Sequence, residues 1–296
     1  MAVQLRSLRA LLHMGNRKSL TCSTKTARKW AGLAGLGRIT WKALISLLFM
    51  TLWIGCAHKD GPIRSKLNAE EVTDKVVLLH GLIRSSISMV GIARRLRSAG
   101  YQVFNLDYSA RQGTLDQMVE ELRGTLQSCC LGGPGRLHFV THSLGGIIVR
   151  EYIAKYPPPN LGRVVMLGPP NQGSELADFF GDNPVAGWVF GPVVAELGTG
   201  PNSKPNQLGP VEFELGVITG DHSWNPIASW MIPGPDDGTV SVERAKVEGM
   251  KRFMVVPHTH TFIMNSDQVI DQVLFFLEHG DFSPAESETL YHLSAP

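Results

Sequence analysis

The chain has 296 residues, of which 43% are hydrophobic and 18% are charged, so it is long enough for one large α/β domain or two small ones. Nine of its 28 basic residues and none of its 26 acidic residues lie within residues 1–42, so the remainder is mildly acidic. A basic head can bind nucleic acid, but no aromatic residues alternate with these cations as on a base-stacking surface, which argues against a nucleic-acid partner.

An uncharged apolar run follows the basic head and has the length of a signal-peptide core, from Ala43 to Cys56. Its end, Trp-Ile-Gly-Cys, resembles a bacterial lipobox, in which the cysteine is lipidated after signal cleavage. Gly55 fits that motif, whereas Trp53 stands where leucine is usual. We favour a lipoprotein-type signal over residues 38–56, with lipidated Cys56 attaching the protein to a membrane of the bacterial cell envelope.

Two alternatives for this N-terminal region stay open. The apolar run can be an uncleaved membrane anchor if it begins at Ile39, which brings it closer to the length of a span. Residues 1–37, rich in Arg, Ser and Thr and free of acids, can instead form a transit peptide. In each case the polar residues 57–73, with Gly61-Pro62 among them, read as a linker to the folded body.

From residue 74 onward, strand and helix patterns alternate. Each expected strand is a short apolar run, and each expected helix shows the spacing of an amphipathic element. Strands are predicted over 75–80, 101–106, 136–141, 162–167, 213–219 and 251–256, and helices over 87–99, 114–128, 144–156 and 262–278. This order predicts an α/β domain, 74–296, with a mostly parallel central sheet and helices on both of its faces.

The alternation breaks at Gly168, and residues 169–210 are rich in Gly, Pro and Asn. Four aromatic side chains in this insertion could form a lid or a wall for a bound acyl chain, or could equally fill the core beneath a long loop. They are Phe179, Phe180, Trp188 and Phe190. We interpret the adjacent Cys129 and Cys130 as two thiols at the end of a helix, and no spaced cysteines suggest a disulfide framework or a metal site.

Ser143 is the candidate nucleophile, because it lies between the apolar strand 136–141 and the helix that begins at Leu144. A sharp strand-to-helix turn can present one hydroxyl in this way. Gly145 and Gly146 lack side chains, so the start of the helix can pack closely against the strand, while Thr141 stands where glycine is usual. The simpler alternative is a serine that only caps the helix.

A serine hydroxyl needs an imidazole to accept its proton and a carboxylate to orient that imidazole. In sheet hydrolases these groups follow in the order Ser, acid, His. We choose Asp237, directly before Gly238, as the acid, with Asp236 and Asp221 as rivals. We choose His260, after the last strand, as the base, with His258 as its rival.

Two backbone amides must stabilise the negative charge that develops on the attacked carbonyl oxygen. We expect the amide of Leu82, in the turn after the first strand, to be one donor, because His80-Gly81 allows a tight turn there. The amide of Leu144, at the positive end of its helix, is expected to be the second donor.

These motifs resemble the α/β-hydrolase superfamily, and within it the bacterial lipases and esterases. The residues that carry the resemblance are Val77-Leu78-Leu79-His80-Gly81, Thr141-His142-Ser143-Leu144-Gly145-Gly146, Asp237-Gly238-Thr239-Val240 and His260-Thr261-Phe262-Ile263-Met264. The resemblance covers about residues 75–282 and supports His260 over His258. It implies an acyl-ester or lipid substrate and no obligatory cofactor, and we see no ligand cluster for a structural Ca²⁺ or another metal.

The expected activity is therefore carboxylester hydrolysis through an acyl-enzyme on Ser143. The same triad could serve an acyltransferase, a thioesterase or an amidase, because a fold does not settle the reaction. A hydrolase-like binding protein without catalysis is the alternative from another functional class. The sequence does not indicate an oligomeric state.

Overall fold

The computed structural model describes residues 73–181 and 183–284. The predicted leader 1–37, the signal or anchor segment 38–56 and nearly all of the linker 57–73 lie outside these residues. Within the described part of the chain, no helix is both long enough and apolar enough to cross a bilayer.

Six parallel strands form one sheet in the order β2-β1-β3-β4-β5-β6. The strands are β1 (Lys75–Leu79), β2 (Gln102–Leu106), β3 (Leu137–His142), β4 (Leu161–Leu167), β5 (Leu215–Gly220) and β6 (Arg252–Val256). β3 and β5 are buried along their whole length, as expected for central strands covered on both faces. The predicted α/β class with a parallel sheet is confirmed.

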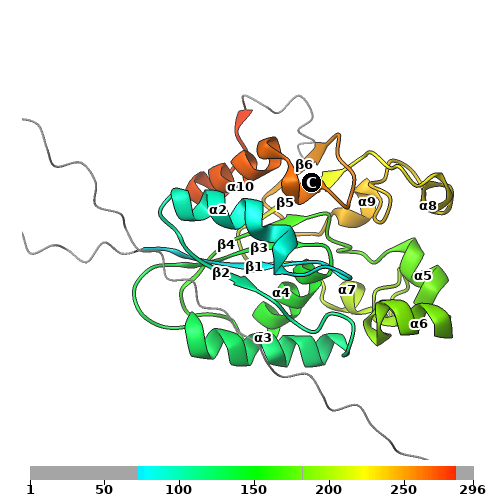
Figure 1. Cartoon of the computed structure of the whole chain (residues 1–296), viewed down its shortest axis with the longest axis horizontal. Helices are drawn as coiled ribbons and strands as arrows, with labels where there is room; N and C mark the ends of the chain where they lie inside the picture. Colours follow the sequence, from blue (N-terminus) through cyan, green and yellow to red (C-terminus); the bar gives the residue numbers. More distant parts are fainter. Residues whose placement is uncertain (1–72, 182, 285–296) are drawn as a thin grey trace, which may run out of the picture. The chain divides into compact units, whose positions relative to one another are not determined.

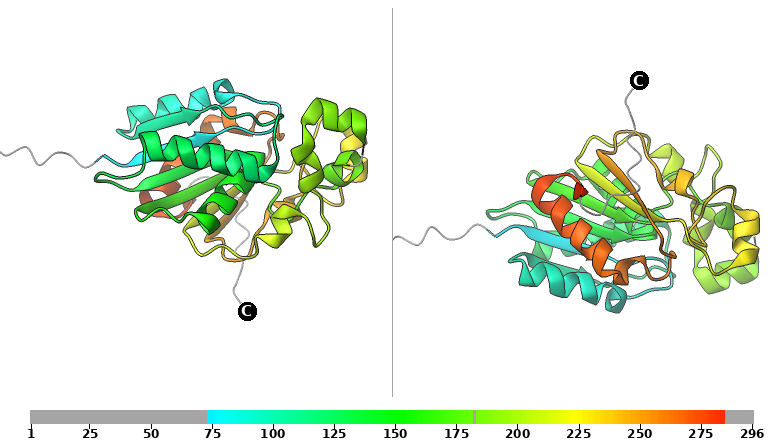
Figure 2. Two further views of the ribbon diagram at one scale, coloured as in Figure 1. Left: turned by 90° about the horizontal axis from the view of Figure 1, so that it is seen from below. Right: turned by 90° about the horizontal axis from the view of Figure 1, so that it is seen from above.

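Helices cover both faces of the sheet (Figures 1 and 2). One face carries α3 (Leu115–Cys129) and α4 (Leu144–Lys155), and the other carries α2 (Val90–Ser98) and α10 (Asp267–His279). Alternate side chains of each strand serve the two cores, so in β1 Val77 and Leu79 face α3 and α4, while Val76 and Leu78 face α2 and α10.

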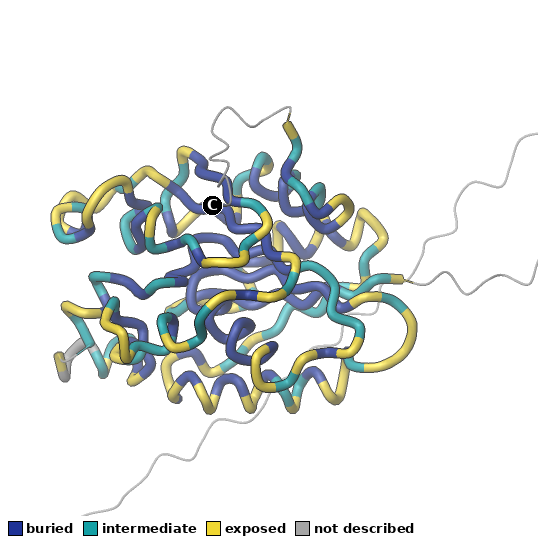
Figure 3. The backbone as a smooth tube through the Cα atoms, turned by 180° about the vertical axis from the view of Figure 1, so that it is seen from behind, coloured by how far each residue is buried: buried dark blue, intermediate teal, exposed yellow. Residues whose placement is uncertain are grey.

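The insertion between β4 and β5 contains α5 (Glu175–Gly181), α6 (Pro184–Phe190), the 3-10 helix η2 (Pro192–Glu196) and α7 (Lys204–Gln207). Two short helices that the sequence pattern did not reveal, α8 (Pro226–Met231) and α9 (Val242–Ala245), lie between β5 and β6. In Figure 1, α5, α6 and α8 project at one end of the body. Figure 3 shows the sheet buried and the α8 segment mostly exposed.

Two predicted helices begin later than their pattern suggests. The last one starts at Asp267 rather than Phe262, because Ser266 caps it by accepting a hydrogen bond from the Val269 amide. Residues Ile263–Asn265 before it form a separate 3-10 turn, η3. The first helix is likewise divided, with a 3-10 turn η1 (Ser86–Met89) before α2.

The interpretation of Cys129 and Cys130 as two thiols is wrong, because the structure joins them in a disulfide. Cys129 is the last residue of α3, and Cys130 leaves the helical conformation with φ −133° and ψ −24°. This change of backbone direction lets two neighbouring side chains turn towards one another, which the helical pattern alone did not indicate.

Candidate active site

The turn between β3 and α4 holds Ser143 in a conformation that few residues adopt. Its φ of 53° and ψ of −122° lie outside the regions that non-glycine residues favour. Such backbone strain costs of order 1–3 kcal/mol and persists only where the surroundings hold it in place. Here the Ser143 amide donates to the Leu167 carbonyl at 2.9 Å, which fixes the turn against β4.

Small residues around the turn allow the helix to approach the sheet closely. A Cβ on Gly145 would lie 2.9 Å from the carbonyl oxygens of both Leu79 and His80, at the end of β1. A Cβ on Gly146 would lie 3.1 Å from Met166 Sδ and 3.2 Å from Pro169 Cβ, so this position is also crowded.

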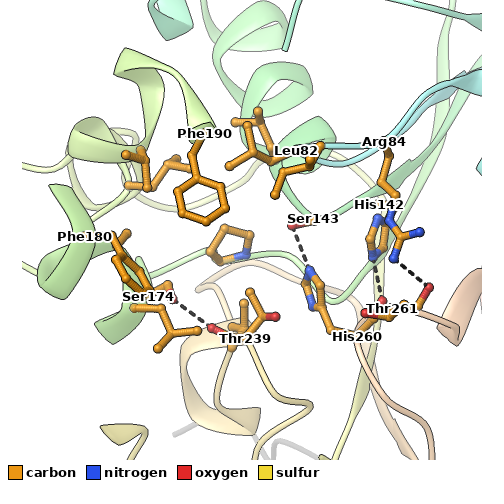
Figure 4. Close-up of a pocket in the computed structure, with 18 residues that line it drawn as sticks. Leu82, Arg84, His142, Ser143, Ser174, Phe180, Phe190, Thr239, His260 and Thr261 are labelled. Atoms are coloured by element: carbon orange, nitrogen blue, oxygen red, sulfur yellow. Dashed lines mark hydrogen bonds between the residues drawn. The ribbon is translucent and has the colours of Figure 1, made fainter. Parts of the chain in front are cut away.

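Three side chains from distant parts of the chain form a continuous hydrogen-bonded chain. His260 Nε2 lies 3.0 Å from Ser143 Oγ, and His260 Nδ1 lies 2.7 Å from Asp237 Oδ2. Because the carboxylate only accepts, Nδ1 carries the proton and Nε2 accepts the hydrogen bond from the Ser143 hydroxyl. All three residues are buried (Figure 4 shows Ser143 and His260).

Asp237 is held by the backbone of its own turn. Its Oδ1 accepts the amides of Thr239 at 3.0 Å and Val240 at 2.8 Å, and its carbonyl accepts the His260 amide at 2.8 Å. One carboxylate oxygen is thus occupied by the turn and the other is left for the imidazole. This arrangement orients both the acid and the base.

The rival residues occupy other positions. Asp236 Oδ1 accepts from Ser229 Oγ and the Gly238 amide, so it stabilises the turn rather than the imidazole. Asp221 pairs instead with the neighbouring His222 at 2.8 Å. Burial lowers the pKa of His258, and this side chain makes no hydrogen bond within the described residues.

The amides of Leu82 and Leu144 have no hydrogen-bond partner within the described part of the chain, so both are free to receive a substrate oxygen. The Leu82 amide belongs to the same peptide unit as the Gly81 carbonyl. His80 Nδ1 donates to that carbonyl at 2.8 Å, and His80 is itself buried under Tyr108, with ring centroids 4.3 Å apart. In a trans peptide the two groups point in opposite directions, so the His80 contact fixes the direction of the Leu82 amide.

The residue after Leu82 adds to the strain of this loop. Ile83 has a φ of 57°, which is a rare conformation for a β-branched side chain. Arg84 then donates from Nη2 to the Thr261 carbonyl at 3.3 Å, which ties the loop after β1 to the loop that carries His260. The two loops that flank Ser143 are therefore connected (Figure 4).

His142, next to the serine, supports His260 in a way that the sequence did not reveal. Its Nε2 donates to the His260 carbonyl at 3.0 Å, and the two rings lie 4.8 Å apart. Burial and the neighbouring His260 hold the pKa of His142 well below its usual range. The His142 imidazole is therefore neutral at neutral pH, and its hydrogen bond holds the backbone of His260 in place.

A cavity of about 430 Å³ opens onto Ser143. Most of its wall is apolar and comes from the loop after β1, the start of α4, and the α5–η2 segment. Of the four aromatic residues predicted for an acyl wall, Phe180 and Phe190 line this cavity (Figure 4). Phe179 and Trp188 do not, and their side chains are 61% and 86% exposed. Whether the insertion moves as a lid stays a prediction.

No group of three His, Cys, Asp or Glu side chains within residues 73–181 and 183–284 is arranged to hold a metal ion. The polar groups at the cavity are instead a serine, an imidazole with its carboxylate, and two free amides. Together they can deprotonate a hydroxyl and stabilise an oxyanion.

Comparisons with known proteins show a family-model match and a likeness of fold. A family model described as serine aminopeptidase, S33, matches residues 70–209. The mature lipase BlEst2 of Bacillus licheniformis has a TM-score of 0.55 at 19% identity, over 70% of this chain and 93% of that one.

Two further solved structures are similar. Phospholipase PlaB from Legionella pneumophila has a TM-score of 0.52 at 17% identity, over 62% of this chain and 52% of that one. The metagenomic carboxyl esterase MGS0156 has a TM-score of 0.51 at 16% identity, over 65% and 66% of the two chains. At these identities the likeness is one of fold.

Proposed function

We propose that this chain is a member of the α/β-hydrolase superfamily and a serine hydrolase that cleaves carboxylic esters of apolar acids, which the family-model match over residues 70–209 and the lipase-like fold support. The observation that carries the proposal is the hydrogen-bonded chain from Asp237 through His260 to Ser143, at the floor of an apolar cavity.

The proposed reaction has two halves. Ser143 Oγ attacks the ester carbonyl while His260 Nε2 takes its proton, and the amides of Leu82 and Leu144 receive the negative oxygen. His260 then gives the proton to the departing alcohol, which leaves an acyl group on Ser143. A water molecule, deprotonated by His260, attacks the acyl-enzyme; the bond to Ser143 Oγ breaks, His260 returns the proton to that oxygen, and the acid is released. Asp237 stabilises the imidazolium in both halves.

The character of the cavity favours esters over peptides. An aminopeptidase must recognise the ammonium group of its substrate, usually with a carboxylate. No Asp or Glu lines the cavity within the described residues, and its wall is mostly apolar. An acyl chain matches this wall, whereas a charged amine would be buried without a partner.

The N-terminal region supports attachment to a membrane. We propose that the apolar segment ending at Cys56 brings the hydrolase to a bacterial membrane, either through lipidation of Cys56 or as an uncleaved anchor. An intact mass of the mature protein distinguishes the two forms, because lipidation would make a modified Cys56 the first residue.

Turnover of p-nitrophenyl butyrate, octanoate and laurate by the full chain tests the proposed activity, with an amino-acid p-nitroanilide as the peptidase substrate. We expect ester turnover to fall by about 10⁶-fold in Ser143→Ala, since the nucleophile is lost. Ser174→Ala is the matched control, because Ser174 lines the same cavity but donates to the Thr239 carbonyl. Undiminished ester turnover by Ser143→Ala, or turnover of the anilide alone, would contradict the proposal.

A further inference from the structure

The exposed apolar side chains of this protein are concentrated in a few segments. Nine large apolar residues are exposed among the described residues, and six of them belong to α5, α6, α8, the loop just before α8 and the loop that carries His260. We call these six the aromatic rim: Phe179, Trp188, Trp224, Ile227, Trp230 and Phe262.

The tryptophans make this concentration unusual. Of the six tryptophans in the chain, three lie in the described part, and all three belong to the rim. Trp188, Trp224 and Trp230 are 86%, 81% and 87% exposed. Tryptophan is on average one of the more buried residue types. Three exposed tryptophans at one end of the body therefore indicate an interaction surface.

The members of the rim are linked to each other and to the cavity. The Trp224 ring lies 5.7 Å from the ring of Phe262, which is two residues after His260. The Phe179 ring lies 5.0 Å from that of Phe180, which lines the cavity. Helix α8 lies against α5, and Figures 1 and 2 show both at the same end of the body as α6. The rim therefore borders the cavity that opens onto Ser143.

From this placement we infer that the aromatic rim docks the catalytic body onto the surface of a neutral or zwitterionic lipid bilayer. Tryptophan favours the membrane–water interface, because its ring is apolar and its N–H can still reach water. A lipid acyl chain would then pass from the bilayer into the cavity without crossing bulk water.

The charge of the segments that form the aromatic rim indicates which lipid headgroups it can bind. Neither residues 175–190 nor residues 221–235 contain a Lys or Arg, and both stretches contain acids. Next to Phe262, Arg84 donates to the Thr261 carbonyl, but a single arginine is not a basic cluster. Attraction to anionic lipid headgroups needs clustered basic residues, so we expect this surface to bind mainly through apolar contact. Binding should therefore depend little on salt and should not increase with anionic lipid.

The chain outside the described residues is long enough to permit this docking. The apolar run that ends at Cys56 is the proposed membrane attachment, and residues 57–73 separate it from β1. Seventeen residues span at most about 60 Å when extended. A body tethered to the bilayer in this way meets its surface at high effective concentration, so even a weak apolar rim can dock.

Fluorescence quenching by brominated lipid tests contact between the rim and the bilayer. The full chain carrying Ser143→Ala, which cannot hydrolyse lipid, is reconstituted into phosphatidylcholine vesicles with or without bromine on the upper acyl carbons. The same chain with Trp224→Phe and Trp230→Phe keeps an apolar rim but lacks these two reporters. The difference in fluorescence emission between the two chains comes from Trp224 and Trp230, because the emission of the N-terminal tryptophans is common to both chains and cancels.

We expect brominated lipid to reduce this emission difference by about half or more, in low and in high salt, with no increase when phosphatidylglycerol is added. An emission difference that is the same in both lipids would overturn the proposal. So would a concentration-dependent dimer in sedimentation that hides these tryptophans without lipid, because a second copy would then be the partner. Neither result depends on whether Ser143 is catalytic.

A second pair of variants, made with Ser143 present, links docking to substrate access. Trp224→Ser with Trp230→Ser removes apolar area, whereas Trp224→Phe with Trp230→Phe retains most of it. We expect the serine pair to lower turnover of vesicle-borne esters by about tenfold or more while leaving soluble butyrate ester turnover unchanged. Equal vesicle-borne turnover by the serine and phenylalanine pairs would contradict the proposed role of the rim.

Discussion

The floor and the rim of the cavity are built in opposite ways. On the floor, Ser143, Asp237 and His260 are buried, and each is held by several hydrogen bonds from separate loops. On the rim, three tryptophans are more than 80% exposed. Catalysis requires side chains that are held in a fixed geometry. Contact with a lipid surface requires only apolar side chains that are exposed on the side facing the lipid. The comparison predicts that floor variants lose catalysis and rim variants lose access to lipid.

The largest effect on the floor should come from the imidazole. His260→Ala removes the base and should lower kcat for ester hydrolysis by about 10⁶-fold. His258→Ala is the matched control, since His258 lies two residues away and its side chain makes no hydrogen bond in the described structure; its kcat should stay near that of the native chain. Equal losses of kcat in the two variants would show that catalysis depends on the conformation of this loop and not on the His260 imidazole.

The carboxylate should come next. Asp237→Asn keeps the shape of the side chain but can no longer stabilise the imidazolium, so kcat should fall by about 10⁴-fold. Asp236→Ala should lose little activity and should instead lower the unfolding temperature, because it removes the oxygen that accepts from the Ser229 hydroxyl and the Gly238 amide. The reverse pattern in steady-state kinetics and thermal unfolding would assign the acid to Asp236.

A smaller effect is expected from His80, which positions the Leu82 amide through the Gly81 carbonyl. His80→Leu should lower kcat about 10- to 100-fold with little change in KM, since a misdirected donor fails only towards the oxyanion. His80→Asn places an amide nitrogen near the position of Nδ1 and should restore most of the rate. If both variants raise KM and leave kcat unchanged, His80 shapes the binding site instead.

The smallest effect concerns stability against acid. Burial lowers the pKa of His80, His138 and His142, so in each case the unfolded chain binds a proton before the folded chain does. The contribution of these three neutral, buried histidines to the free energy of unfolding is fully present above the ordinary histidine pKa of about 6.5. This contribution is lost as the pH falls below that value. The free energy of unfolding, measured in urea, should decrease between about pH 6.5 and pH 5, by up to about 1.4 kcal/mol per pH unit for each histidine.

His138→Asn isolates one of these histidines away from the active site. His138 Nδ1 accepts the Arg163 amide at 2.9 Å, and an asparagine oxygen can accept the same hydrogen bond without titrating. The variant should therefore lose less stability than the native chain over this pH range. Parallel curves for the two proteins would exclude His138 from the acid response.

The sequence predicts the floor far better than the rim. All six strands were predicted within two residues, because buried parallel strands are apolar runs that local pattern reveals. The chosen serine, acid and histidine each follow a strand of this sheet, and their loops meet because parallel strands end at one edge.

What the sequence missed depends on contacts through space. Helix α8 was not predicted because six residues beginning at Pro226 have no visible periodicity. The supports that His80 and His142 give to neighbouring carbonyls depend on the direction of each ring, which residue spacing does not encode. Phe262 to Met264 continue the apolar spacing of α10, so only the cap at Ser266 marks where that helix begins.

Labelling with a fluorophosphonate probe, followed by peptide mapping, tests most directly whether the floor is a working nucleophile site. The probe reacts only with a hydroxyl that is activated by a base and placed beside oxyanion donors. We expect one adduct, on Ser143, which disappears in His260→Ala and persists in His258→Ala. A folded protein that gains no adduct, or gains it on another serine, would contradict the account.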